Sequence, residues 1–296
     1  MVRGGWLLGV VITMGCATTP AVAPTFTYAP PPGTRYVRTV KVVNEASLLG
    51  RPYRQRVEQE FVWNVGFARE GELTLVTQQL QRLAVRVNGL DVIDGERVPG
   101  SNVSVDLLVS REPRVVEVRG AERAAEVLSG MAAPGVDRAS APRLGTQQVK
   151  EIAMARFEMV VRDVVGHPTA PGSTWTVADT DPTVKRKSMT VDRLEPCGAA
   201  RCARVTAQYD VDPQAAARQA LREAAEFLAA NGVNPADAEV LEASLDYRDE
   251  LLLEPNTLVD HGATFSQIAR VTFSGPRGQR IPVEFRTLLE QSSMFP

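Results

Sequence analysis

The chain has 296 residues, 44% of them hydrophobic and 23% charged, which is the composition of an ordinary globular protein. This composition excludes collagen-like, coiled-coil and wholly disordered chains. Lysine and arginine (33) nearly balance aspartate and glutamate (35), so the net charge is -2. A nucleic-acid-binding protein needs a surplus of positive charge to neutralise phosphates, and none is present. Two histidines and three cysteines offer few ligands for a zinc or iron–sulfur site, and we expect neither a metal nor a cofactor.

Residues 1–16 have the pattern of a signal peptide, with a positive charge at Arg3, a short apolar run over residues 6–14 and a cysteine at position 16. The apolar run is shorter than the roughly 20 residues that a helix needs to span a bilayer. No later segment approaches that length without charges, so we do not expect a protein with several membrane spans.

The four residues Thr13-Met14-Gly15-Cys16 resemble a bacterial lipobox. The resemblance implies cleavage before Cys16, acylation of this cysteine and attachment of the protein to a membrane. Ala17 in the next position implies the outer membrane, with the protein facing the periplasm, under the enterobacterial sorting rule. Two alternatives remain at this point, namely an ordinary export signal that leaves a free thiol and a wrongly assigned start codon.

Residues 17–34 contain five prolines and no charged side chain. Such a composition favours extended, solvated chain, and it predicts a tether between the anchor and a folded domain. From Arg35 to Pro296 no stretch has the composition of a linker. We therefore expect a single domain over residues 35–296.

Alternation of apolar and polar residues with a period of two predicts strands along much of this domain. Two long pairs are expected, 53–67 with 72–88 and 239–253 with 258–274, and a further strand follows at 280–291. Each has one apolar and one polar face, which is typical of an antiparallel sheet. Strands of this length indicate a wide sheet that is twisted and curved.

Three segments with helical periodicity interrupt the strands: 121–130, 147–165 and a third that begins after Asp212 and stops at Asn231-Gly232. Thr146 and Asp212 are the predicted N-caps of the two longer helices. Both of these helices are amphipathic, so each needs an apolar partner. The fold class that follows is α+β, with a large, curved, half-barrel-like antiparallel sheet packed on two to three amphipathic helices. Two intertwined β-helix halves are the alternative.

Cys197 and Cys202 bracket a four-residue turn between two strand-like runs, and we expect a disulfide between them. A redox-active role is disfavoured because the spacing is not C-x-x-C, and no further zinc ligands lie nearby in the sequence. His167 and His261 lie in no catalytic motif, and on a strand His261 points away from its neighbour Asp260. The chain has no P-loop, G-x-G-x-x-G or H-E-x-x-H motif, so we predict no catalytic residues.

The segment Pro171–Thr176 delivers Trp175 through a turn into the start of a strand, which makes Trp175 a predicted core anchor. The Gly172-to-Trp175 turn, the lipobox and the strand-rich pattern together resemble a broad group of bacterial exported lipoproteins of uncharacterised function. The architecture is also similar to the half-barrel of the outer-membrane lipoprotein carrier and receptor, in which a curved sheet and a helical lid enclose acyl chains. That similarity is one of fold, since no motif residues match.

These features predict a non-enzymatic envelope lipoprotein that binds a hydrophobic ligand, either a lipid or an acyl chain. A scaffold or accessory subunit that contacts another envelope protein is the alternative, and an enzyme with an unrecognised site is the second alternative. The binder requires a cavity between helices and sheet, whereas the scaffold requires an exposed apolar patch or strand edge. The side chains expected to line the cavity are Phe157, Val160, Leu221, Leu228, Trp63 and Trp175.

Overall fold

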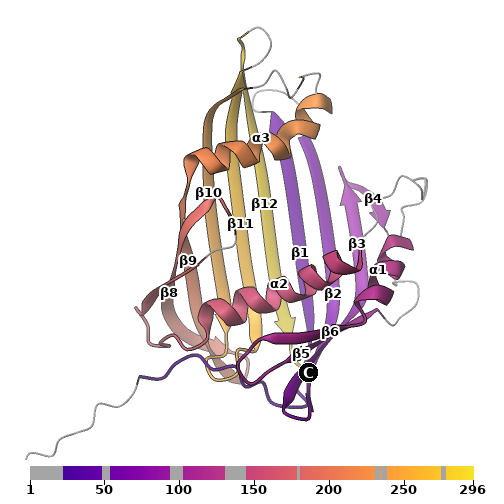
Figure 1. The fold of residues 1–296 in the computed structure, drawn as a ribbon, viewed down its shortest axis with the longest axis vertical. Helices are drawn as coiled ribbons and strands as arrows, with labels where there is room; N and C mark the ends of the chain where they lie inside the picture. The colour runs from indigo at the N-terminus through magenta and orange to yellow at the C-terminus, as the bar shows by residue number, and fades with distance from the viewer. Residues whose placement is uncertain are drawn as a thin grey trace, which may run out of the picture.

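The computed structural model describes residues 23–48, 54–93, 103–130, 145–178, 181–230, 234, 239–274 and 278–296. Cys16 and the predicted signal peptide lie outside the described residues. Over the described part of the chain, twelve strands form one antiparallel sheet that three helices accompany (Figure 1). Within these ranges, no helix combines the length and the hydropathy that crossing a membrane requires.

The elements follow the predicted order along the chain. The strands are β1 (Arg35–Leu48), β2 (Arg54–Glu70), β3 (Leu73–Val87), β4 (Leu90–Ile93), β5 (Ser104–Val109), β6 (Val115–Arg119), β7 (Thr174–Val177), β8 (Val184–Cys197), β9 (Ala200–Val211), β10 (Glu239–Leu253), β11 (Asp260–Ser274) and β12 (Arg280–Met294). The helices are α1 (Ala121–Gly130), α2 (Thr146–Val164) and α3 (Pro213–Ala230). The order in the sheet is β6-β5-β3-β2-β1-β12-β11-β10-β9-β8-β7, and β4 pairs with β3 off this path. All of the long strands and helices predicted from periodicity are present.

Strand β1 joins the two halves of the chain, since it pairs with β2 on one side and with β12 on the other. Val40, for example, lies between Phe61 of β2 and Gln291 of β12. The first and last long strands of the domain are therefore neighbours within one continuous sheet. The alternative of two intertwined β-helix halves is wrong, because a β-helix stacks parallel strands and the pairs described here are antiparallel.

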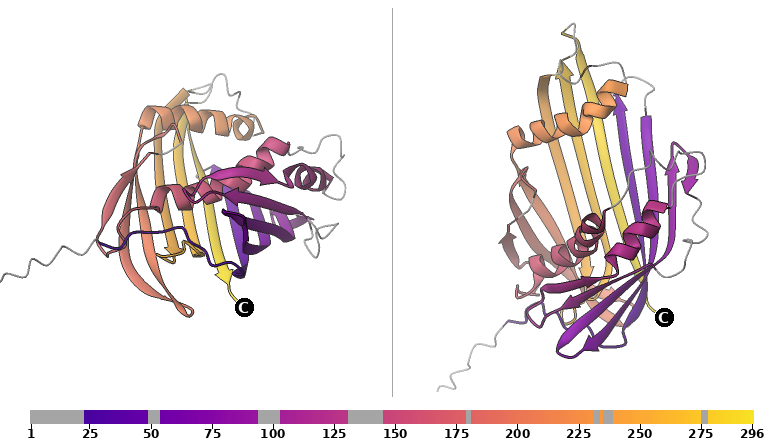
Figure 2. Two further views of the ribbon diagram at one scale, coloured as in Figure 1. Left: turned by 60° about the horizontal axis from the view of Figure 1, so that its bottom comes forward. Right: turned by 45° about the vertical axis from the view of Figure 1, so that its right-hand side comes forward.

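The sheet is curved, and α2 and α3 lie across its concave face as two separate bars (Figure 2). Helix α1 packs beside α2, next to β5. The predicted antiparallel sheet with accompanying helices is confirmed. Strands outweigh helices strongly, so the fold is mostly β, with its helices gathered on one face.

The start of α3 confirms its predicted N-cap. The Asp212 carboxylate accepts hydrogen bonds from the backbone N–H groups of Gln214 (2.8 Å) and Ala215 (3.1 Å). The bonds from Ala215 and Gln214 lower the pKa of Asp212, because they favour its ionised form. The local sequence thus determines where this helix begins.

The predicted N-cap of α2 is wrong by one residue. Gly145 is the N-cap, and Thr146 is the first residue of the helix. The side-chain oxygen of Gln148 accepts a hydrogen bond from the Gly145 backbone N–H at 2.8 Å. This bond from the third helical position satisfies an N–H group at the helix start, so the Thr146 hydroxyl is not needed as a cap.

Three groups of buried apolar side chains hold the helices to the concave face. The first lies between α1, α2 and strands β1–β3 and β5, with Leu107 fully buried within it. The second lies between the C-terminal half of α2 and β8–β11 and contains Val164 and Met189. The third lies under α3, where Ala224 packs with Phe273. Each longer helix therefore has the apolar partner that its amphipathic pattern requires.

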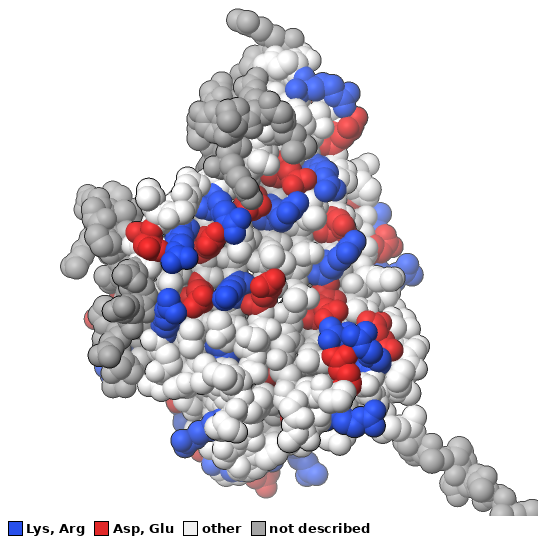
Figure 3. All heavy atoms as spheres, turned by 180° about the vertical axis from the view of Figure 1, so that it is seen from behind, with Lys and Arg blue, Asp and Glu red and all other residues white. Residues whose placement is uncertain are grey.

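The convex face carries interleaved positive and negative side chains (Figure 3). Ion pairs link neighbouring strands there, as between Arg270 of β11 and Glu284 of β12 (2.9 Å) and between Arg56 of β2 and Glu45 of β1 (2.8 Å). Exposed pairs of this kind contribute little to stability. The alternating sequence pattern therefore gives the sheet a concave face that carries the apolar core and a convex face that carries charged side chains.

Residues 24–34 do not form the solvated tether that the sequence predicts. Phe26 is 1% exposed, its ring lies 6.1 Å from that of Trp175, and its backbone N–H donates to the His167 carbonyl at 2.9 Å. The ring of Tyr28 packs edge-on against Phe157 at 5.3 Å. The physical reason is that two large aromatic side chains favour burial more than the surrounding prolines favour solvation. This segment belongs to the folded domain.

Candidate functional site

A row of side chains crosses the concave face between α2 and α3. Cross-strand pairing places Val42 of β1 beside Leu289 of β12, and Leu289 beside Phe265 of β11. Gln59 of β2 and Asp249 of β10 continue the row at its two ends. We call these five residues the central row. Its middle is apolar, with Val42, Leu289 and Phe265 side by side.

The central row lies between the packed groups of the core. On β11, Ala263 belongs to the group under α2 and Val271 to the group under α3, and both are buried. Phe265 shares their face, because alternate residues of a strand point to the same side. Nevertheless Phe265, Val42 and Leu289 are only half-buried. The two helices therefore leave the middle of the concave face partly uncovered.

The next row toward α3 is polar. It consists of Asn44, Thr287, Gln267 and Tyr247, which pair side by side from β1 to β10. The Thr287 hydroxyl donates to Asn44 Oδ1 at 2.9 Å, and the Tyr247 hydroxyl donates to the Asp181 carboxylate at 3.3 Å. We call these four residues the polar row. The concave face thus places an apolar strip beside a strip of hydrogen-bonding side chains.

A buried ion network closes the β10 end of the central row. Lys187 Nζ of β8 lies 3.2 Å from the Asp163 carboxylate of α2 and 3.5 Å from the Asp249 carboxylate of β10. The Tyr209 hydroxyl also donates to Asp249, at 3.2 Å. Arg162 pairs with Asp163 at 3.0 Å from a more exposed position, so two cations balance two carboxylates. The network attaches the C-terminal end of α2 to the sheet.

Trp175 attaches the same end of α2, which confirms it as a core anchor. Its indole N–H donates to the Asp163 carbonyl at 2.7 Å, and the His167 ring stacks on it at 4.8 Å. Burial lowers the pKa of His167. Gly172 makes the preceding turn with a φ of 83°, a conformation that favours glycine, and its N–H donates to the Val191 carbonyl. The Gly172-to-Trp175 turn therefore has a structural role.

Two of the predicted cavity residues belong to the core instead. Val160 and Trp175 are buried in the group under α2, where they pack with side chains of β8–β11. The apolar side chains Val160, Val161 and Val164 in the C-terminal half of α2 are all buried. Val160 and Trp175 therefore complete the core and do not line a cavity.

The other predicted cavity residues have a different placement. Phe157 and Trp63 are half-buried and pack at the border of the first core group. The side chains of Leu221 and Leu228 lie outside the described residues. Sequence reasoning missed the central row, because a period of two shows which residues face inward but not which of them the helices leave uncovered.

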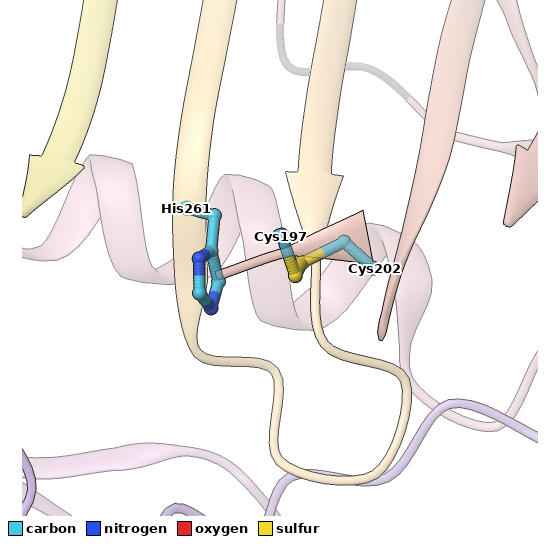
Figure 4. A group of neighbouring side chains, drawn as sticks. All are labelled: Cys197, Cys202 and His261. Carbon is cyan, nitrogen blue, oxygen red and sulfur yellow. A yellow bond between two sulfur atoms is a disulfide. The ribbon is translucent and has the colours of Figure 1, made fainter. Parts of the chain in front are cut away.

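The predicted disulfide between Cys197 and Cys202 is present, with Cα atoms 5.8 Å apart. His261 of β11 lies beside it, and the two sulfurs and one ring nitrogen of His261 lie within 4.8 Å of one another (Figure 4). His261 Nε2 is 2.7 Å from Glu254 Oε1. Sequence reasoning missed this proximity, because the β8–β9 hairpin and the β10–β11 loop meet only in the folded sheet.

The convex face contains a groove of about 850 Å³ near the start of β1 and the end of β12. Gly66, Ala68, Arg35, Arg69 and Met294 are among the residues that line it. Met294 is 69% exposed. No residue of the central row and none of the predicted cavity residues lines this groove, so the groove is a separate feature.

Similarity to known proteins is weak. The chain matches no family model and no curated protein sequence. It is similar to lipovitellin, in a structure titled for lipid–protein interactions, with a TM-score of 0.44 and 10% identity over 90% of this chain and 26% of that chain. It is also similar to DynF of the dynemicin biosynthesis pathway from Micromonospora chersina (TM-score 0.21, 10% identity, 97% of this chain and 93% of that chain). The chain thus spans about a quarter of the lipovitellin chain, and similarities of this size support no functional conclusion.

Proposed function

We propose that this protein is a non-enzymatic lipoprotein of the cell envelope that binds a hydrophobic ligand, a lipid or an acyl chain, on the concave face of its sheet. The observation that carries the proposal is the half-buried apolar middle of the central row, formed by Val42, Leu289 and Phe265. Apolar surface that stays open between two covering elements is typical of a ligand-binding site. The ion network at one end holds α2 in place beside it.

The central row suits an elongated ligand. It crosses five neighbouring strands from β2 to β10, and strands lie about 4.8 Å apart, so the row extends about 19 Å. A ligand lying across the strands would contact one inward side chain of each strand. Covering apolar surface contributes about 25 cal/mol per Å² removed from water. An extended acyl chain fits this shape, and the adjacent polar row offers hydrogen bonds to an ester, amide or hydroxyl group.

The proposed location in the envelope rests on two features. The Gly15-Cys16 pair resembles the end of a lipobox, which would place an acyl group on Cys16 and anchor the protein in the outer membrane. The disulfide between Cys197 and Cys202 is typical of an oxidising compartment such as the periplasm. Both features support an exported protein that works beside a membrane, where lipids and other envelope proteins are the available partners.

A pair of neighbouring substitutions tests the ligand site. Leu289 faces the concave side, whereas Leu288 faces the convex side, where it pairs with Val43 and Ser266. A fluorescent long-chain fatty acid should bind the wild type and Leu288→Glu with similar affinity. It should bind Leu289→Glu at least tenfold more weakly, because a carboxylate then lies in the apolar strip. Equal binding by all three proteins, or no binding by the wild type, would contradict the proposal.

The convex groove favours a second candidate function, a scaffold that contacts another envelope protein. The specific observation is Met294, a large apolar side chain that lines this groove and is 69% exposed. A photo-crosslinking residue at position 294 would then capture one defined envelope protein in cells, and the same residue at Lys41, on the convex face but outside the groove, would not. If the protein with the crosslinker at position 294 captures such a partner and the wild type binds no fatty acid, the scaffold function would replace the ligand-binding function.

A further inference from the structure

The side chains around the disulfide form a cluster that the proposed lipid site does not use. Cys197 ends β8, Cys202 lies in β9, and His261 lies in β11. Glu254, in the turn between β10 and β11, contacts the histidine. We propose that reduction of this disulfide creates a binding site for Zn²⁺, with the two cysteine sulfurs and a ring nitrogen of His261 as its protein ligands.

The geometry fits a thiolate–imidazole site. Zinc binds sulfur at about 2.3 Å and nitrogen at about 2.0–2.1 Å, so ligand atoms of a tetrahedral site lie about 3.5 to 3.8 Å apart. The two sulfurs and a nitrogen of His261 lie within 4.8 Å of one another. In the disulfide the sulfurs are bonded to each other and cannot both hold a metal. After reduction, rotation of the two cysteine side chains brings the sulfurs to the required separation.

His261 already makes the carboxylate hydrogen bond that metal-ligating histidines typically make. Its Nε2–H donates to Glu254 Oε1 at 2.7 Å, which leaves Nδ1 with the free lone pair in the neutral ring. The Thr257 hydroxyl donates to the other Glu254 oxygen at 2.7 Å, and the Phe295 ring stacks on the imidazole at 4.4 Å. A carboxylate that orients a histidine and raises its basicity is the usual outer-shell partner of a zinc ligand.

Because both cysteines are buried, a bound cation would stabilise their ionised thiols. Both residues are buried, so ionised thiols would lack water as a partner. Two thiolates and one Zn²⁺ together carry no net charge, and neutral His261 adds none. Thiolate and imidazole ligands also select zinc over magnesium or calcium, which prefer oxygen. The site has three protein ligands and one position left for water.

Each chemical step balances with a named reductant. A phosphine donates two electrons to the S–S bond and becomes a phosphine oxide, while water supplies its oxygen and the two protons of the new thiols. Binding of Zn²⁺ then releases both thiol protons to solvent and forms two sulfur–metal bonds. In a cell the electron pair would come from a dithiol, which is itself oxidised to a disulfide. The metal would replace the covalent bond between Cys197 and Cys202 with coordination bonds that also reach His261 of β11.

Titration of the full chain with Co²⁺ as a spectroscopic substitute for zinc tests the site. Phosphine-reduced wild type should bind one Co²⁺ with thiolate-to-metal charge-transfer absorption, and the oxidised protein should bind none. His261→Ala should weaken binding at least tenfold, and Glu254→Gln by roughly 10- to 100-fold as an outer-shell change. His167→Ala is the matched control, because His167 stacks on Trp175 outside the cluster, and it should bind as the wild type does.

Two results would overturn the proposal. The first is that the reduced wild type binds no Co²⁺, whether or not reduction changes its circular dichroism spectrum. The other is equal Co²⁺ affinity in the wild type and His261→Ala, which would show that the thiols alone capture the metal. Neither result bears on fatty-acid binding at the central row, so the two proposals can fail separately.

Discussion

Lys187 of β8 and Asp163 of α2 form an ion pair of 3.2 Å in which each side chain is only 3% exposed. Asp249 of β10 shares the same ammonium group at 3.5 Å. Removing three charges from water is costly, and the cost is offset only while each charge keeps its partners. The end of α2 is therefore held to two strands by contacts that depend on one another, beside the site proposed for the ligand.

Lys187→Met should destabilise the protein by about 3 to 5 kcal/mol, because it leaves Asp163 and Asp249 buried without their shared cation. Chemical denaturation followed by circular dichroism measures this loss. Lys41→Met is the control, since Lys41 is 58% exposed and lies 4.0 Å from Glu60, and it should cost about 1 kcal/mol or less. Similar losses in the two variants would contradict the importance of the buried network.

Phe26→Ala should destabilise the domain by about 3 to 5 kcal/mol, as expected for truncation of a fully buried aromatic ring. A free tether would show no such loss. Thr27→Ala, at the exposed neighbouring position, should change stability by no more than about 0.5 kcal/mol. Protease resistance of residues 24–34 in the wild type, lost in Phe26→Ala, would provide a second measure of docking.

Tyr28→Phe should stabilise the protein by up to about 1 kcal/mol, because the Tyr28 hydroxyl is buried and has no hydrogen-bond partner among the described residues. Burial also raises the pKa of Tyr28 above its ordinary value. The neutral hydroxyl is then favoured in the folded state. This effect on the free energy of unfolding is fully present below the pKa that Tyr28 has in the unfolded chain, and it is lost as the pH rises through the pKa that Tyr28 has in the folded protein. The wild type should therefore lose more stability than Tyr28→Phe in strongly alkaline solution. An unchanged or lower melting temperature for the variant at neutral pH would show that the hydroxyl has a partner.

Asp212→Ala should lower the melting temperature, because the N–H groups of Gln214 and Ala215 lose their acceptor. The pKa of Asp212 is depressed in the folded protein, so its stabilising effect is present above the unfolded pKa and is lost as pH falls through the folded one. Asp212→Asn should keep most of the cap at neutral pH and remove this acid dependence. Identical acid unfolding of wild type and Asp212→Asn would contradict the assignment.

Cys16→Ser should abolish acylation, if the lipobox resemblance is correct. Cells fed an alkyne-bearing palmitate should label the wild-type protein and not this variant. Cys197→Ser with Cys202→Ser is the control, since those cysteines are paired in the domain and their loss should leave labelling intact. Equal labelling of wild type and Cys16→Ser would reject the lipid anchor.

Much of the fold could be predicted because its signals are local. Apolar and polar residues alternate along each long strand, which marks both the strand and its buried face. The Asp212 carboxylate caps a helix that begins at the next residue, and Cys197 and Cys202 need only a short turn to meet. Each of these relationships spans a few residues, so it is visible in the chain before folding.

Local signals were wrong where a competing contact outweighed them, whether that contact was distant or close in the sequence. The prolines of residues 24–34 predicted a tether, but Phe26 finds a buried place beside Trp175. Thr146 has the side chain of an N-cap, but the contact between Gln148 and Gly145 starts the helix one residue earlier. In both cases the local preference of the residues is real, and a competing contact determines the structure instead.

The sequence by itself determined the antiparallel strands, the three helices, the disulfide pair and the likeness of residues 13–16 to a lipobox, because each depends on neighbours along the chain. The tertiary structure alone decided that β1 and β12 adjoin, that Lys187 joins Asp163 to Asp249, and that His261 meets the disulfide. It also decided which inward side chains the helices leave half-exposed. These relationships depend on which strands far apart in the sequence become neighbours within one curved sheet, and periodicity along the chain shows which residues share a face but not which strands pair.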